Sequence, residues 1–192
     1  VYRNRIRKIN GRSYAFDGIG RMQTGFVLFD GKSEFVARYE VDDWSSEDFI
    51  EGTIYGIEKS DLYLFSSDEL NDGSMQIGKD IAVELEDGVF HFGFASNGKA
   101  FGNRNRLQKK EGMYYINGLR LEADEEYGYG VVKVEDGADA YYQVVDTRGK
   151  VIEGKKKIVK DKEGGYLLII RNRLVAWCGD EDKPRWRKGE EG

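Results

Sequence analysis

Apolar and polar residues alternate with a period of two over most of the chain. Because successive side chains of a β-strand point to opposite faces, this alternation predicts strands with one buried face. Asp-Gly and Gly-Gly pairs interrupt the alternation and supply the positive φ that tight hairpin turns require. We therefore predict an all-β chain with at least four β-hairpins, in residues 26–37, 81–94, 131–145 and 156–170.

One stretch, "DDWSSEDFIEG" at residues 42–52, favours a helix instead. Either Ser45 or Ser46 is suited to cap its first turn, and Gly52 is suited to end it. Because the surrounding segment is short and acidic, we expect an insertion or a looser joint there. The predicted order is first hairpin repeats, acidic joint or insertion, further hairpin repeats and polar C-terminal tail, in residues 1–40, 41–60, 61–178 and 179–192.

A short unit recurs along the chain. Its first copy, "YAFDGIGRMQTG" at residues 14–25, has two aromatics two apart, an acidic turn and a return arm with methionine and glycine. "YLFSSDELNDGSMQIG" at 63–78 repeats it with a longer turn, and looser copies occupy 90–102 and 142–154. The motif residues to which we assign structural roles are Tyr14, Phe16, Gly20, Met22, Gly25, Tyr63, Phe65, Gly73, Met75 and Gly78.

A unit of about 20 residues with one hairpin cannot bury its apolar face alone. We therefore predict that tandem hairpins stack in chain order as an elongated, solenoid-like module. In this arrangement the glycines form the bends, and each methionine is a flexible filler beneath the next unit.

The charge balance argues against one class of partner. Thirty Lys and Arg residues against thirty-five Asp and Glu residues give a net charge of −5, with the two signs interspersed. Nucleic-acid-binding proteins carry a basic face instead, so we expect no nucleic acid partner. The basic run "GKKKIVK" at 154–160 is the exception, and we interpret it as a solvated strand face in preference to a contact for an anionic polymer. No apolar run approaches the roughly 20 residues of a membrane span.

Few residues are suited to catalysis or metal binding. The chain has one histidine, His91, and one cysteine, Cys178. A single cysteine excludes an internal disulfide and a multi-cysteine metal site. We expect no metal, no cofactor and no enzymatic activity, and we expect both residues to be dispensable for ligand binding. Turn carboxylates such as Asp17, Asp30 and Asp87 are expected to accept hydrogen bonds from their own backbone.

The repeated unit resembles the cell-wall-binding repeats of Gram-positive surface proteins, the group that includes choline-binding and glucan-binding modules. The first copy carries the family's aromatic, Asp, Gly-x-Met and Thr-Gly positions, with Phe26 in place of the closing tryptophan. The second copy carries many of these positions, and the later copies carry fewer. The resemblance implies stacked β-hairpins that attach a secreted protein to the cell envelope.

The resemblance also bears on the ligand. In choline-binding members, indole rings from neighbouring repeats surround a quaternary ammonium group, which cation–π attraction holds. We expect choline to bind poorly to this chain, because the leading tryptophan positions carry Ser13, Leu62, Val89 and Met113.

Aromatic residues are the best candidates for contact with a sugar. Most rings, such as Tyr14 and Phe16, are expected to pack in the core, because one strand face must be buried. Adjacent tyrosines point to opposite faces, so one ring of each pair should be exposed. The predicted carbohydrate-binding residues are Phe26, Tyr114, Tyr115, Tyr141 and Tyr142.

The sequence thus favours a noncatalytic module that binds a cell-wall polysaccharide or teichoic acid outside the cell, at the cell surface. The alternative is a structural spacer or protein-interaction module whose repeats have lost their ligand sites. An enzyme is the third interpretation, but we find no constellation of residues that would support one.

Overall fold

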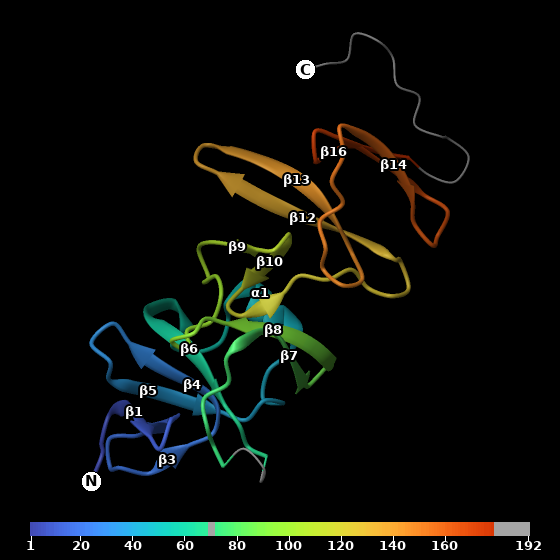
Figure 1. Ribbon diagram of the computed structural model, residues 1–192. Coiled ribbons are helices and arrows are strands. Elements are labelled where there is room, and N and C mark those ends of the chain that lie inside the picture. The colour runs from blue at the N-terminus through green and yellow to red at the C-terminus, as the bar shows by residue number, and fades with distance from the viewer. Residues whose placement is uncertain (69–71, 179–192) are drawn as a thin grey trace. The chain divides into compact units, whose positions relative to one another are not determined.

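The computed structural model describes residues 1–68 and 72–178, which are mostly antiparallel strands (Figure 1). Within these residues the helical elements are α1 (Ser46–Glu51) and the 3-10 turn η1 (Ile57–Lys59). The all-β prediction is confirmed, and the predicted tail at 179–192 lies outside the described residues. The strands are β1 (Arg5–Ile9), β2 (Arg12–Phe16), β3 (Met22–Gln23), β4 (Gly25–Asp30), β5 (Phe35–Tyr39), β6 (Ser60–Phe65), β7 (Gly78–Leu85), β8 (Gly88–Phe94), β9 (Gln108–Lys110), β10 (Met113–Ile116), β11 (Leu119–Arg120), β12 (Tyr129–Asp136), β13 (Asp139–Asp146), β14 (Lys156–Lys160), β15 (Tyr166–Ile170) and β16 (Arg173–Cys178).

The chain divides into two compact units. Unit 1 comprises Val1–Gln108 and Tyr115–Arg120, and unit 2 comprises Lys109–Tyr114 and Leu121–Gly192. Unit 1 contains the sheets β1-β2-β3 and β5-β4-β6 and the strands β7, β8 and β11. Unit 2 contains the sheets β12-β13 and β14-β15-β16, and the division between the units falls within β9 and β10. None of the described helices is long and apolar enough to cross a membrane.

All four predicted hairpins are confirmed. They are the antiparallel pairs β4–β5, β7–β8, β12–β13 and β14–β15. The pairs β1–β2, β10–β11 and β15–β16 are further hairpins. Each of the turns in these three pairs contains two residues with positive φ, at Asn10–Gly11, Asn117–Gly118 and Arg171–Asn172, which is the backbone conformation of a two-residue type I′ turn.

Strand β4 is the middle strand of the sheet β5-β4-β6, and both of its faces are buried (Figure 1). Phe26 and Leu28 belong to one apolar cluster of unit 1, while Val27 and Phe29 belong to another. The prediction that the Phe26 ring is exposed is therefore wrong, since its side chain is 1% exposed. The alternation argument assumes one solvated face, and β4 has a core on each side.

The predicted helix is confirmed, but its surroundings differ from the expectation. The Asp48 carboxylate accepts hydrogen bonds from the Ser45 backbone N–H (3.0 Å) and hydroxyl (2.8 Å), and Gly52 ends the helix in the left-handed region. Phe49 is fully buried, with its ring centroid 5.0 Å from those of both Phe26 and Phe92. Residues 41–60 therefore contribute to the core of unit 1, and the expectation of a loose joint is corrected.

The four copies of the repeated unit share one turn geometry. In each copy the last strand residue pairs with an apolar residue after the turn: Phe16 with Met22, Phe65 with Met75, Phe94 with Ala100, and Val145 with Val151. A backbone N–H at the start of each turn donates to a carbonyl four to eight residues later, over 2.8 to 3.0 Å. Turns outside the four copies, at Asp30 and Asp161, repeat this arrangement.

Consecutive copies in unit 1 are joined in chain order. The Met75 N–H of copy 2 donates to the Ser13 carbonyl beside copy 1, and the Ala100 N–H of copy 3 donates to the Leu62 carbonyl beside copy 2, each over 2.8 Å. The methionines also reach the following copy, because a Cβ on Gly73 would lie 3.0 Å from Met22 Cε and a Cβ on Gly98 would clash with Met75. Glycine is thus required where a methionine packs on the next turn.

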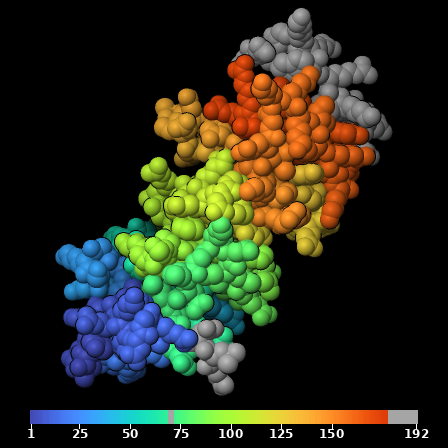
Figure 2. All heavy atoms as spheres, in the orientation of Figure 1, coloured from blue at the N-terminus to red at the C-terminus, as the bar shows by residue number. Residues whose placement is uncertain are grey.

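Unit 2 has its own apolar core. Val144, Val159, Leu167 and Ile169 are buried together, and they come from β13, β14 and β15. The space-filling view shows side chains filling the spaces between the strands of each unit (Figure 2). The backbone of the fourth repeat copy belongs to this unit, where the Val151 N–H donates to the Gly112 carbonyl over 2.9 Å.

Candidate ligand-binding site

The predicted sugar-binding rings do not form one site. Phe26, Tyr114 and Tyr115 are buried, at 1%, 5% and 0% exposure. Tyr141 is partly buried, and Tyr142 is 46% exposed. The expectation of one exposed ring holds for the second tyrosine pair and is wrong for the first. A ligand role for Tyr141 and Tyr142 stays a prediction.

Tyr114 and Tyr115 are both buried because each face of β10 packs against a different part of the chain. The Tyr115 ring lies edge-on to Phe101 in unit 1, with 5.3 Å between centroids. The Tyr114 hydroxyl donates to Gln143 Oε1 over 2.7 Å in unit 2. Burial, with a smaller contribution from Tyr141, raises the pKa of Tyr114 to about 12. Both rings therefore have structural roles.

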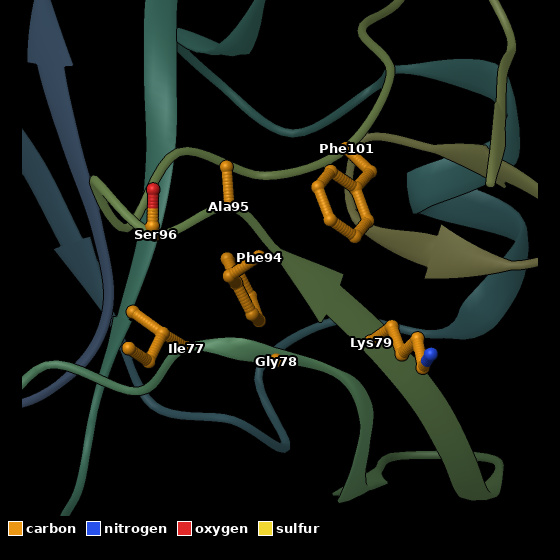
Figure 3. Close-up of a pocket in the computed structure, with 7 residues that line it drawn as sticks. All are labelled: Ile77, Gly78, Lys79, Phe94, Ala95, Ser96 and Phe101. Atoms are coloured by element: carbon orange, nitrogen blue, oxygen red, sulfur yellow. The ribbon is translucent and has the colours of Figure 1, made fainter.

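Unit 1 contains a mostly apolar pocket of about 410 Å³ between the second and third repeat copies. This volume is within the range of small-ligand pockets. The return arm of copy 2 and the strand end and return arm of copy 3 form its walls (Figure 3). We call it the junction pocket; its lining residues are Ile77, Gly78, Lys79, Phe94, Ala95, Ser96 and Phe101.

Tyr115 holds two walls of the junction pocket together. Its hydroxyl donates to the Lys79 carbonyl over 2.7 Å, and its ring packs on Phe101. Gly93 leaves room for both rings, because a Cβ there would lie 2.7 Å from Tyr115 Cε1 and would clash with Phe101. Next to Lys79, the buried Arg120 guanidinium donates to Asp80 Oδ1 over 2.8 Å. These contacts define the pocket before any ligand arrives, which lowers the ordering cost of binding.

The chemistry of the junction pocket suits an apolar face better than a cation. Ile77 is 54% exposed and Phe101 is partly exposed, whereas Phe94 is 1% exposed and forms the floor. None of the described residues that line the pocket is a tryptophan, and the lining includes the cationic side chain of Lys79. A quaternary ammonium group would meet neither an aromatic cage nor an acidic partner here. A sugar ring can place its C–H face on Phe101 and its hydroxyls near Ser96.

A second, polar pocket of about 310 Å³ also lies in unit 1. It is bordered by Gly31, by residues 57–61 and by residues 103–105. Its Asp61 carboxylate pairs with Lys99 Nζ over 2.7 Å. This hydrogen bond, with a smaller contribution from charge, raises the pKa of Lys99. The Ser60 hydroxyl is buried and has no hydrogen-bond partner among the described residues.

The residues considered for catalysis do not assemble. His91 is partly buried in β8 opposite Ala82, and the side chain of Cys178 is outside the described part of the structure. The described residues include no group of three or more His, Cys, Asp or Glu side chains placed to hold a metal ion. Asp17 and Asp30 accept hydrogen bonds from backbone N–H groups of their own turns, as predicted.

Asp87 differs from the other turn carboxylates. It accepts hydrogen bonds from the Ser46 backbone N–H (2.9 Å) and hydroxyl (2.5 Å) at the start of α1. The expectation that Asp87 bonds to its own turn is corrected by this contact across 41 residues of sequence.

Sequence reasoning missed the residues of the junction pocket. Ile77 and Lys79 are in the return arm of copy 2, and Phe101 follows the return residue of copy 3. The sequence signal that could have located them is the repeat itself, because sites in the resembled family form between neighbouring repeats. The departures at those positions drew attention to what was lost and away from the new apolar lining.

No family model matches the chain, and no curated protein matches it. One similar solved structure is CbpJ from Streptococcus pneumoniae TIGR4, with 14% identity, a TM-score of 0.47 and coverage of 91% of this chain and 63% of that chain. Another is alternansucrase in complex with isomaltononaose, with 15% identity, a TM-score of 0.21 and coverage of 88% of this chain and 15% of that chain. This chain therefore spans less than two thirds of either protein. With TM-scores this low, neither similarity carries an argument about fold or function.

Proposed function

We propose that this chain is a noncatalytic module that binds a cell-wall polysaccharide or teichoic acid and holds a secreted bacterial protein at the cell surface. The observation that carries the proposal is the junction pocket between copies 2 and 3. It lies between neighbouring repeats, which is where choline-binding members of the resembled family hold their ligand. The tandem stacking of the hairpins as an elongated solenoid is part of the proposal, and small-angle scattering that fits a compact sphere would contradict that part.

The pocket supports a glycan ligand over choline. Its lining offers Phe101 and Ile77 to an apolar ring face, and the Lys79 cation repels a quaternary ammonium group. A single site of this kind binds weakly, and repeated contacts along a polymer raise the retention.

The proposal predicts that the protein pellets with purified Gram-positive cell walls and that free choline does not release it. Phe101→Ala removes the exposed ring, and Ile77→Lys adds a charge at the exposed edge of the pocket. Each change should weaken retention by about fivefold, the equivalent of roughly 1 kcal/mol for one aromatic or apolar contact. Retention is measured by quantifying bound and free protein over a series of wall concentrations.

Tyr55→Ala is the matched control, because this ring is 77% exposed and does not line the pocket. It should leave retention unchanged. Circular dichroism confirms that each variant is folded. A folded wild-type chain that stays in the supernatant with every wall preparation would contradict wall binding and favour the spacer alternative.

A further inference from the structure

Five basic side chains gather at one end of the sheet β14-β15-β16 in unit 2. Three of them are the consecutive residues Lys155, Lys156 and Lys157, and the turn between β15 and β16 adds Arg171 and Arg173. All five are exposed. We call this group the basic cluster. The chain around β14, coloured orange, lies at the surface in Figure 2.

Backbone hydrogen bonds hold the two segments of the basic cluster side by side. The Arg171 N–H donates to the Lys155 carbonyl and the Asn172 N–H donates to the Gly154 carbonyl, each over 3.0 Å. The Asn172 side-chain oxygen accepts the Gly154 N–H over 2.7 Å. The cations are therefore fixed in one place by the fold and do not depend on a flexible run of lysines.

The sheet register extends the cluster across three strands. Lys156 is opposite Ile170, and Ile170 is opposite Arg173. The Arg173 guanidinium carbon lies 4.1 Å from the centroid of the Tyr141 ring, which holds it in place by a cation–π contact. The nearest carboxylate in sequence, Glu153, is 3.7 Å from Lys109 Nζ, so its charge is shared with a lysine outside the cluster.

A concentration of five cations is unusual in a chain of net charge −5. Like charges held together repel one another, and a bound polyanion would relieve this repulsion and release its own counterions. Salt confines the attraction to about 10 Å, so a flexible polymer can bind here without lying along the acidic remainder of the protein. A stiff nucleic acid duplex cannot avoid that remainder.

We infer that the basic cluster binds the phosphate groups of a flexible phosphodiester polymer of the teichoic acid type. The polymer's identity rests on the proposed envelope function, whereas the phosphate chemistry rests on the cluster alone. The junction pocket and the basic cluster are then separate contacts, one for an apolar sugar face and one for anionic linkages.

The test uses the full chain and two soluble probes, long-chain inorganic polyphosphate and purified teichoic acid, in isothermal titration. The variant Lys155→Gln/Arg171→Asn removes two charges, and asparagine tolerates the positive φ of 49° at position 171. Affinity for both probes should fall about tenfold, and the dependence of affinity on salt should become shallower. The control Arg21→Gln/Lys32→Gln removes the same net charge from exposed turns of unit 1 and should change affinity by less than about twofold.

Several outcomes would overturn the inference. Equal losses in the two double variants would show that net charge alone matters, and tighter binding to single-stranded DNA than to teichoic acid would identify a different polymer. If the cluster variant binds normally but aggregates, the lysines protect the exposed edge of β14 from pairing with other strands. Retention on walls stripped of teichoic acid, without polyphosphate binding, would reject the inference and leave the proposed function standing. Polyphosphate binding without retention on any wall would do the reverse.

Discussion

Tyr115 is the single residue on which the junction pocket depends most. Its hydroxyl bond to the Lys79 carbonyl spans 36 residues of sequence, and its fully buried ring supports Phe101. Burial is the main cause that raises the pKa of Tyr115, with the Arg120 guanidinium opposing it. The hydroxyl therefore stays protonated and keeps its donor role across the ordinary pH range.

Two substitutions at this position separate the hydroxyl from the ring. Tyr115→Phe leaves the Lys79 carbonyl without this donor and should lower the free energy of unfolding by about 1 kcal/mol. Tyr115→Ala opens a cavity in unit 1 and should lower it by about 3 to 5 kcal/mol. Urea unfolding followed by circular dichroism measures both, and equal effects of the two variants would show that the ring packs loosely. Wall retention, measured below the unfolding transition, should fall in Tyr115→Phe if the pocket geometry depends on this bond.

At the scale of elements, α1 shows how a six-residue helix is held in a β-rich chain. The Asp48 carboxylate accepts hydrogen bonds from the Thr53 hydroxyl (2.6 Å) and from Ser45. The Asn117 side-chain amide, which is buried, donates to the Phe49 carbonyl over 2.8 Å. A helix of this length is not stable alone, so these bonds and the burial of Phe49 supply what propensity cannot.

The hydrogen bonds to Asp48, that from Thr53 foremost, lower the pKa of its carboxyl below the ordinary 3.8. Because the folded pKa is the lower one, this group's contribution to stability is fully present above pH 3.8 and is lost as the pH falls through the folded value. Asp48→Asn keeps an acceptor oxygen but cannot be protonated. The stability difference between wild type and Asp48→Asn should therefore shrink as the pH falls below 3.8, in urea titrations over a pH series.

Glu47→Gln is the control for this measurement, since it removes an exposed carboxylate from the same helical turn. Its effect should be small at every pH. A difference between wild type and Asp48→Asn that stays constant through the acid range would show that the charge of Asp48 contributes nothing to the helix.

At the scale of the whole molecule, the two units exchange segments of chain. Unit 1 is completed by residues 115–120, which follow a segment of unit 2 in the sequence. Those residues bring Tyr115, Asn117 and the buried Leu119 to the core of unit 1. The boundary between the units is thus not a single linker, although each unit has its own core.

This exchange predicts the behaviour of fragments. A fragment of residues 1–120 contains all of unit 1 and should unfold cooperatively in urea. A fragment of residues 1–108 lacks the exchanged segment and should unfold at a lower urea concentration with a broader transition, because it exposes the core around Phe92 and loses the partner of Phe49. Identical transitions for the two fragments would show that residues 109–120 contribute nothing to unit 1.

Features that depend on neighbours a few residues apart were determined by the sequence itself. The alternating runs predict the four hairpins, and Asp30 with its turn, or Ser45 with Asp48, form their hydrogen bonds within five residues. Such contacts form wherever the local residues are present, because closing a short loop costs little entropy. The recurring turn of the four copies belongs to the same class.

Only the tertiary structure decided which faces became buried and which residues met. Alternation cannot tell whether a strand has one core or two, so the burial of Phe26 and of the Tyr114–Tyr115 pair was beyond its reach. The junction pocket needs the fit of three segments around Tyr115, and the basic cluster needs the turn at Arg171 to meet the start of β14. These contacts depend on long-range packing, and packing is set by the shapes of side chains that the period of a pattern does not record.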